Sequence, residues 1–186
     1  MTIWYQPEGG APRAIAGGGE AFPATVFEQV NPEMGDQVRS FAVDQLGNVA
    51  GRRVWDLYSG IGETTLQLIR LGATVESVEL DRRAVAEAEA RGPAARRHVG
   101  RVEDVLRELH RPDMVIVNPP RTGMDARVTA DLSRLAPQRV VYISCDPATL
   151  ARDLQRMDRL RLASVQAFDL FPQTSHVETV AVLEPV

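Results

Sequence analysis

The sequence predicts an α/β fold: a mostly parallel, Rossmann-like sheet of seven strands, with helices on both faces and an antiparallel hairpin at one edge. From residue 53 onward, short apolar runs alternate with amphipathic segments, which is typical of right-handed crossovers between parallel strands. The last two apolar runs are joined by Phe171-Pro172-Gln173-Thr174-Ser175, without a helix. We therefore expect these two runs to pair antiparallel at the sheet edge.

The period of the apolar residues places each element. Val38, Phe41, Ala42 and Leu46 recur at helical spacing and predict a helix over 32–46. Compact apolar runs predict strands at 53–57, 74–79, 114–117, 140–143, 162–168 and 177–183, with a weaker seventh at 97–99. Amphipathic segments predict the remaining helices at 63–71, 82–91, 102–109, 126–135 and 147–157.

The chain predicts one domain with a short lead-in. Residues 1–24 are rich in Gly, Pro and Ala and predict an irregular segment, and residues 25–186 predict the folded catalytic domain. The sequence has no apolar run long enough to span a membrane and no signal-peptide pattern. The one cysteine, Cys145, excludes an internal disulfide and a cysteine-ligated metal cluster within one chain. We therefore expect a cytoplasmic protein without a metal.

The charge of the chain does not identify a partner. The net charge is −4, whereas phosphate binding favours a basic surface. All of the basic residues other than histidine are arginines, which suit phosphate contacts and base stacking. A GC-rich genome would give the same composition, so charge alone neither supports nor excludes RNA.

A glycine turn after the first predicted strand of the domain is a candidate cofactor site. Val54-Trp55-Asp56-Leu57-Tyr58-Ser59-Gly60-Ile61-Gly62 runs from a strand into a Gly-x-Gly turn, and ligands of such sheets bind at the carboxyl ends of the strands. Thr65 replaces the third glycine of the dinucleotide fingerprint, and Glu63 disfavours a pyrophosphate at the helix start. A cationic ligand without phosphate, such as S-adenosylmethionine, fits this turn better.

Acidic residues at later strand ends extend this site. Glu79 ends the next predicted strand, where a carboxylate can accept both ribose hydroxyls. Glu103-Asp104 follows the third strand and suits an exocyclic amine, with Asp104 as the candidate contact. The simpler interpretation is that these acids only cap helices, and Asp104 is the residue most open to that interpretation.

Two further strand ends carry candidate chemical groups. Asn118-Pro119-Pro120-Arg121 follows one strand, and Ser144-Cys145-Asp146-Pro147 follows the next. Asp146 and Pro147 form a good start for a helix, so the helix dipole is expected to lower the pKa of the Cys145 thiol. Most lone cysteines are buried and inert, which is the alternative.

A nucleophilic cysteine beside a methyl donor suits carbon 5 of uracil. Attack at carbon 6 makes an enolate that can accept a methyl group, and a base must then remove the carbon-5 proton. His176-Val177-Glu178 is the candidate source of this base, because alternation places His176 and Glu178 on one face. A raised pKa would suit Glu178 to this role, although both side chains could simply face solvent.

Five segments together resemble the RNA uracil-5-methyltransferases of tRNA and 23S rRNA, from about residue 25 to the end. They are Phe27-Glu28-Gln29-Val30-Asn31, Asp56 to Gly62, Asn118-Pro119-Pro120-Arg121-Thr122-Gly123, the run from Ser144 to Asp153, and the run from Phe171 to Glu178. The resemblance implies the class I methyltransferase fold, Cys145 as nucleophile and Glu178 as base. It also implies that Gln29, Tyr58, Glu79 and Asn118 contact S-adenosylmethionine, with Arg121 and Thr122 near the target base.

The sequence departs from the family pattern in several places. Position 118 is Asn where many members have Asp, Glu63 stands where Asn or Thr is common, and Asp146 replaces a common Asn. Family members usually carry an N-terminal oligonucleotide-binding barrel, for which the sequence has no counterpart. RNA affinity is therefore expected to come from the catalytic domain or from a separate RNA-binding subunit.

Two other functions stay open from the residues alone. Asn118-Pro119-Pro120 also resembles the motif of enzymes that methylate amino groups, although Arg121 replaces their aromatic residue and those enzymes need no cysteine. The chain could also be a cofactor-binding remnant that docks RNA or a partner without catalysis.

Overall fold

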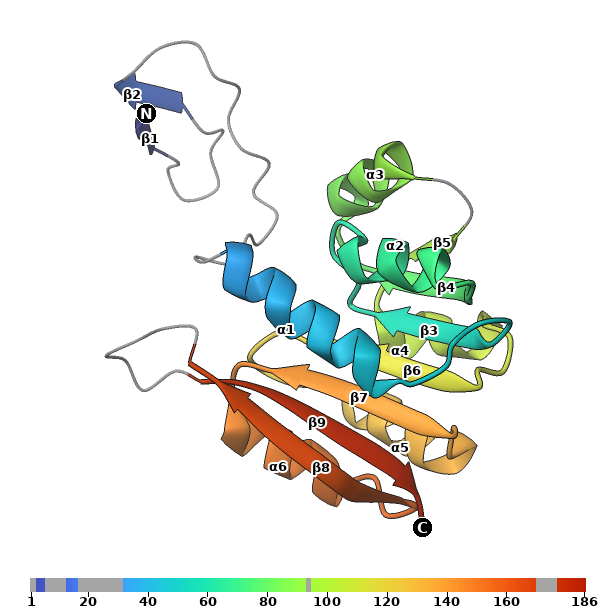
Figure 1. Ribbon diagram of the computed structural model, residues 1–186. Helices are drawn as coiled ribbons and strands as arrows, with labels where there is room; N and C mark the ends of the chain where they lie inside the picture. The colour runs from blue at the N-terminus through green and yellow to red at the C-terminus, as the bar shows by residue number, and fades with distance from the viewer. Residues whose placement is uncertain (1–2, 6–12, 17–31, 93–94, 170–176) are drawn as a thin grey trace.

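The computed structural model describes residues 3–5, 13–16, 32–92, 95–169 and 177–186 (Figure 1). Their main feature is a seven-stranded sheet in the order β5-β4-β3-β6-β7-β9-β8. All neighbouring pairs from β5 to β7 are parallel, and β9 pairs antiparallel with both β7 and β8. The predicted sheet with an antiparallel edge pair is confirmed.

The observed bounds follow the predicted elements closely. The strands of the sheet are β3 (Arg53–Leu57), β4 (Thr74–Glu79), β5 (Arg96–Val99), β6 (Met114–Val117), β7 (Arg139–Ser144), β8 (Leu160–Phe168) and β9 (Glu178–Pro185). The helices are α1 (Pro32–Gln45), α2 (Glu63–Arg70), α3 (Arg82–Arg91), α4 (Val102–Val105), α5 (Ala126–Leu135) and α6 (Pro147–Gln155). None of the described helices is long and apolar enough to cross a membrane.

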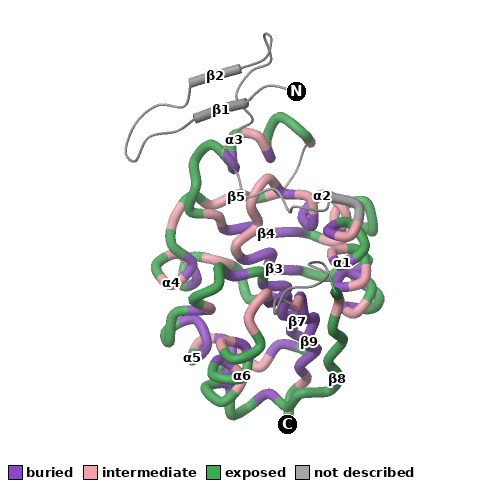
Figure 2. Tube along the Cα trace, turned by 90° about the vertical axis from the view of Figure 1, so that its left-hand side faces the viewer, coloured by how far each residue is buried: buried purple, intermediate pink, exposed green. Residues whose placement is uncertain are grey.

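Alternation along the strands supplies a core on each face of the sheet. In β3, Val54 packs with residues of α1 and α2, whereas Trp55 and Leu57 pack with residues of α4, α5 and α6. The helices therefore form two layers with the sheet between them (Figure 1). Figure 2 shows that β3, β4, β7 and β9 are largely buried, while the edge strand β8 is exposed along most of its length.

Two segments differ from the prediction. The expected helix over 102–109 is divided into α4 and a 3₁₀ turn, η1 (Leu106–Glu108), and such tightening is common in a last helical turn. Part of the predicted irregular lead-in forms two paired antiparallel strands, β1 (Ile3–Tyr5) and β2 (Arg13–Ala16). Ile, Trp and Tyr favour strands. The prediction gave more weight to the glycine content of the segment and therefore missed these two strands.

The topology brings the candidate residues together at one edge of the sheet, the edge formed by the carboxyl-terminal ends of the parallel strands. Strands β3, β4, β6 and β7 run parallel, so the segments that follow them leave from the same edge. Strand β9 runs in the opposite direction and begins there with Glu178. The glycine turn, the 118–123 segment, Cys145 and Glu178 therefore lie at a common edge.

Candidate functional site

The turn after β3 uses three residues with left-handed backbone, Tyr58 (φ 62°), Gly60 (φ 53°) and Gly62 (φ 79°). A Cβ atom on Gly60 would meet nothing within 4 Å, whereas one on Gly62 would lie 2.9 Å from Ala88 Cβ in α3. Gly60 thus leaves open space beside the backbone, as a ligand-binding turn requires. The role of Gly62 in the structure is different from the prediction, because it lets the turn pack closely against α3.

Glu79 lies against this turn, as the sequence predicted. Its Oε2 accepts a hydrogen bond from the Gly60 N–H at 2.9 Å, and its Oε1 accepts one from the Asp81 N–H at 2.9 Å. Asp56 lies beneath it and accepts a hydrogen bond from the Thr65 hydroxyl at 2.5 Å. Burial raises the pKa of Asp56 to about 6, the Thr65 bond opposes this, and the Glu79 charge adds to it. The floor of the turn is therefore acidic.

Two predicted cofactor contacts are engaged in ion pairs elsewhere. Glu63 lies 3.2 Å from Arg39 and 3.8 Å from Arg91. The Asp104 side chain is 56% exposed and accepts a hydrogen bond from Arg127 at 3.0 Å. Both carboxylates form ion pairs with arginines of this chain. For Asp104, this agrees with the alternative interpretation, in which it has only a structural role.

Glu103, the neighbour of Asp104, is the more buried acid of this segment, and its Oε1 lies 3.5 Å from Arg101 Nη1 and 3.8 Å from Arg127 Nη2. Its side chain is 10% exposed, and its charge is among those that raise the pKa of the Tyr58 hydroxyl, after burial. Tyr58 belongs to the glycine turn, so Glu103 and that turn border the same space. The sequence could not assign the faces of these two acids, because a four-residue helix gives no clear period.

The segment after β6 carries the predicted residues Asn118, Arg121 and Thr122, all of which are exposed. The Asn118 N–H donates to the Leu57 carbonyl at 3.2 Å and so continues the pairing of β6 with β3. Further along, the Thr122 carbonyl accepts a hydrogen bond from Arg152 of α6 at 2.8 Å. The segment is thus attached to the sheet at its start and to α6 near its end.

Cys145 occupies the single position between β7 and the N-cap of α6, and it is half-buried. Asp146 caps the helix, because its Oδ1 accepts from the Thr149 N–H at 2.8 Å. On the other side, the Thr179 hydroxyl donates to the Ser144 carbonyl at 2.9 Å and ties β9 to the end of β7. Cys145 is therefore not sealed in the interior, in contrast to the alternative interpretation.

Strand register places Glu178 beside Cys145. Ser144 pairs with Thr179 in the antiparallel ladder of β7 and β9, so the next positions outward are Cys145 and Glu178. The Glu178 side chain is buried, with 4% of its surface exposed. The alternative in which Glu178 faces solvent is therefore wrong.

Burial and neighbouring charges shift the pKa values of Glu178 and Cys145. Burial raises the pKa of Glu178 to about 7, and the Arg121 charge opposes this. Burial also raises the pKa of the Cys145 thiol, followed by the Glu178 charge, while the charge and hydrogen bonding of Arg121 lower it. The raised pKa of Glu178 is the condition that the sequence analysis named for a base at this position. The lowered pKa predicted for Cys145 is wrong, because burial and a neighbouring carboxylate outweigh the helix terminus.

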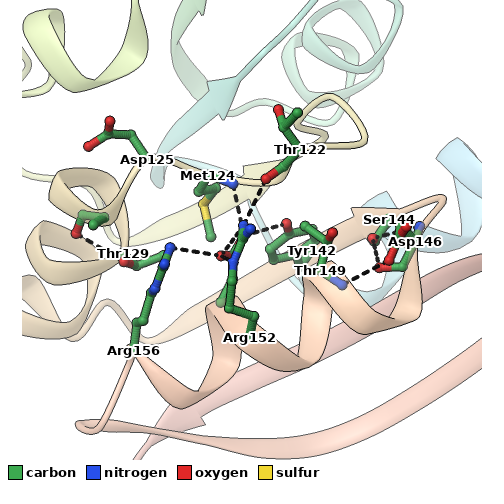
Figure 3. A network of polar contacts seen from close by, with 12 residues as sticks. Thr122, Met124, Asp125, Thr129, Tyr142, Ser144, Asp146, Thr149, Arg152 and Arg156 are labelled. Carbon is green, nitrogen blue, oxygen red and sulfur yellow. Dashed lines mark hydrogen bonds and ion pairs between the residues drawn. The ribbon is translucent and has the colours of Figure 1, made fainter.

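Asp153 of α6 is an important residue that sequence reasoning did not single out. It is completely buried, and its Oδ2 accepts hydrogen bonds from the Tyr142 hydroxyl at 2.9 Å and the Met124 N–H at 2.8 Å. This network joins β7, α6 and the segment before α5 (Figure 3). Its position could have revealed it, since Asp153 lies at helical spacing between the buried residues Leu150 and Met157.

Two predicted residues, Gln29 and His176, lie outside the described residues. Within the described ranges, no group of three His, Cys, Asp or Glu side chains could hold a metal ion.

Comparison with known proteins points in the same direction as these residues. The family model for tRNA (Uracil-5-)-methyltransferase matches residues 86–186. A 23S rRNA (uracil(747)-C(5))-methyltransferase of Shewanella baltica is 34% identical over 167 residues, which cover 84% of this chain and 42% of that protein. An uncharacterized RNA methyltransferase of Lactiplantibacillus plantarum is 38% identical over 178 residues, covering 88% of this chain and 38% of that protein.

A solved structure extends the similarity to three dimensions. The tRNA (uracil-54, C5)-methyltransferase of Pyrococcus abyssi, in complex with S-adenosyl-L-homocysteine, superimposes with a TM-score of 0.76 at 30% identity. The match covers 98% of this chain and 44% of that one. A magnesium protoporphyrin IX methyltransferase of Synechocystis with bound SAM, at 16% identity and a TM-score of 0.64, shares the fold. The chain spans less than half the length of these uracil-methylating relatives.

Proposed function

Because the chain belongs to the tRNA (uracil-5-)-methyltransferase family, we propose that it transfers a methyl group from S-adenosylmethionine to carbon 5 of a uridine in tRNA or rRNA. The observation that carries this proposal is the pairing of a half-buried Cys145 with a buried Glu178 at the strand edge that also holds the glycine turn. A nucleophile and a base at adjacent positions are what the reaction at a pyrimidine requires.

The residues of the glycine turn fit S-adenosylmethionine. The space beside Gly60 is open, and the Glu79 carboxylate lies at its border, where a carboxylate can accept hydrogen bonds from ribose hydroxyls. When bound, this cofactor supplies a methyl group on a positively charged sulfur, which the surrounding acids favour. Tyr58, Gly60, Glu79 and Asn118 are the residues we propose to hold it, together with Gln29, and Glu103 takes the place first given to Asp104. Gly62 supports the turn from behind, and Glu63 acts through its ion pairs with Arg39 and Arg91.

Different side chains have separate proposed roles at the target uracil. Cys145 forms a bond to carbon 6 of the uracil, which is flipped from its stack into the site. Arg121 lies near enough to affect both Cys145 and Glu178, so its guanidinium stabilises negative charge on the thiolate and on the attacked base. After methylation, Glu178 removes the proton from carbon 5, and the bond to Cys145 breaks. Thr122 and His176 are proposed to contact the base.

The partner that follows from this proposal is RNA itself. The relatives named for tRNA or rRNA substrates are more than twice as long as the matched region. The comparisons give no support for the separate RNA-binding subunit that the sequence left open, so the partner we propose is the RNA substrate.

The test uses RNA that contains 5-fluorouridine, incubated with the purified chain and S-adenosylmethionine. Fluorine cannot leave carbon 5 as a proton does, so the covalent complex persists and intact-mass measurement shows protein joined to methylated RNA. We expect this adduct with the natural chain and none with Cys145→Ala. Methyl transfer to uridine RNA by Cys145→Ala would contradict the proposal and favour an amino-group acceptor. Cofactor binding without any adduct would favour a non-catalytic remnant.

A further inference from the structure

The Asp153 carboxylate forms hydrogen bonds with residues of three different segments near the site. Its Oδ2 holds the Tyr142 hydroxyl and the Met124 N–H, and its Oδ1 accepts from Arg152 Nε at 3.0 Å and Arg152 Nη2 at 2.8 Å. Each of these donors comes from a different part of the chain, namely β7, the 118–125 segment and α6. A buried carboxylate saturated in this way fixes its partners relative to one another.

Arg152 carries this connection to the segment that holds Arg121. While Nε and Nη2 bind Asp153, the same Nη2 donates to the Thr122 carbonyl at 2.8 Å. Thr122 directly follows Arg121 in the sequence. The guanidinium of Arg152 therefore lies between the buried carboxylate and the backbone beside Arg121, as Figure 3 shows for Thr122 and Arg152.

Gly123 permits the close approach that this contact needs. It has a φ of +76°, and its N–H donates to the Pro120 carbonyl at 2.7 Å, which closes a tight turn around Arg121 and Thr122. A Cβ atom at this position would lie 2.5 Å from Arg152 Nη2 and from Asp153 Oδ2, and closer still to Thr149 Cγ2. The turn is thus pressed against α6, the helix that begins immediately after Cys145.

Among the described residues, the Arg121 charge affects three titratable groups. Arg121 acts on the Cys145 thiol, the Glu178 carboxylate and the Asp146 carboxylate, each of whose pKa values it lowers. These groups come from the end of β7, the start of β9 and the N-cap of α6. Arg121 is itself exposed, so its own packing does not hold its side chain in this place.

We propose that Arg152, Asp153 and Gly123 form a clamp that positions Arg121 beside Cys145, and that Arg152 is the positioning residue which transmits the buried anchor to the nucleophile. The consequence for catalysis rests on the function proposed above, whereas the position of Arg121 relative to Cys145 does not. Among the described residues, Arg152 hydrogen-bonds Asp153 and the Thr122 carbonyl and neither the cofactor turn nor Cys145, so we propose that it acts through the backbone of Thr122.

The chain offers a matched control for this role. Arg156 also donates to Asp153 Oδ1, at 3.4 Å, and its side chain is 40% exposed against 42% for Arg152. Among the described residues, Arg156 makes no hydrogen bond to the 118–123 segment, and it lies on the other side of the network (Figure 3). If both arginines only neutralised Asp153, their removal would have similar effects. The clamp instead predicts that the two differ.

The experiment measures the pH dependence of alkylation of Cys145 by iodoacetamide, followed by intact mass. Cys145 is the only cysteine in the chain, so the rate reports on this thiol and needs neither cofactor nor RNA. We expect Arg121→Ala and Arg152→Ala to shift the rate profile to higher pH by similar amounts, with about tenfold slower alkylation at neutral pH. Arg156→Ala should match the natural chain, and Arg121→Ala/Arg152→Ala should match Arg121→Ala alone.

The clamp would be overturned if Arg152→Ala kept the natural profile, if Arg152→Ala and Arg156→Ala shifted it equally, or if the effects of Arg121→Ala and Arg152→Ala added. Circular dichroism and thermal unfolding show whether each variant is folded. Should Arg152→Ala not fold, Gly123→Ala displaces the turn while leaving Arg152 intact, and the same shift is expected. Failure to form the RNA adduct with a natural alkylation profile would count against the proposed function alone.

Discussion

Two buried carboxylates near Cys145 differ in what surrounds them. Asp153 is completely buried, and hydrogen bonds from a tyrosine, a backbone N–H and two arginines reach its oxygens. Glu178 is 4% exposed, yet no described residue donates a hydrogen bond to its carboxylate, and burial raises its pKa to about 7. The described residues supply hydrogen-bond donors to Asp153 and none to Glu178.

The difference separates a structural role from a chemical one. Burying a carboxylate is costly unless donors replace the lost water. Around Asp153 that cost is offset by contacts that fix three segments of the chain. Around Glu178 the described residues supply no such donor, and burial raises its pKa to about 7, close to the pH at which a general base is most effective. Burial alone would have assigned both residues to the same class.

The largest expected effect concerns the Glu178 carboxylate. Glu178→Gln keeps the shape of the side chain but cannot accept the carbon-5 proton, so turnover on uridine RNA should fall by about 10²- to 10⁴-fold. The bond between Cys145 and carbon 6 still forms in this variant, so a covalent protein–RNA complex should accumulate on ordinary uridine RNA. Denaturing gels and intact mass would detect it. Equal turnover in Glu178→Gln and the natural chain would remove Glu178 from the base role.

The second prediction concerns the Asp153 carboxylate. Asp153→Ala leaves the Tyr142 hydroxyl, the Met124 N–H and the Arg152 guanidinium without their acceptor, and should lower the free energy of unfolding by about 3–5 kcal/mol. Urea unfolding measures this change. Asp158→Ala is the control, since Asp158 is exposed and accepts one hydrogen bond from Ser133, and should cost about 1 kcal/mol. Similar losses in the two variants would show that the Asp153 network has no special weight.

The third prediction uses pH to sharpen the same comparison. The pKa of Glu178 is raised in the folded chain to about 7 from an ordinary 4.5, so the protonated form is favoured by folding. Its contribution is therefore present below pH 4.5 and is lost as the pH rises to 7. Glu178→Gln has no proton to lose, and should become more stable than the natural chain by about 2 kcal/mol above pH 7. Unfolding in urea at pH 5 and pH 8.5 tests this, and a constant difference would contradict it.

Much of the fold was predictable because its elements are encoded locally. The bounds of β3, β4, β6, α3 and α5 agree with the prediction at both ends, since each is a strongly patterned run closed by a turn or a cap. The split of α4 and the strands β1 and β2 were missed where the pattern is short. Local period gives the type of an element where a compact apolar run marks it, as in β6, and it is less informative in the glycine-rich lead-in and in the short helix α4.

The site was predictable in its members but not in their electrostatics. The sequence pointed to Cys145, Arg121, Glu79 and Glu178 because each lies at or next to the end of a strand. The direction of the Cys145 pKa was wrong because the helix terminus is a local feature, whereas the opposing Glu178 charge comes from another strand. Asp153 was missed for the same reason, since its donors come from segments that are distant along the chain.

The smallest expected effect concerns the two acids of α4, which repeat the comparison at the cofactor side. Both acids pair with Arg127, but Glu103 is 10% exposed and acts on Tyr58, whereas Asp104 is 56% exposed. Glu103→Gln should therefore weaken S-adenosylmethionine binding, measured by calorimetry, by about 1 kcal/mol, which is about fivefold in Kd. Asp104→Asn removes only an exposed ion pair and should leave Kd unchanged, because such pairs contribute little. If instead Asp104→Asn weakened binding and Glu103→Gln did not, the side chain that the sequence first indicated would be the true contact, and α4 would have to turn its other face to the ligand.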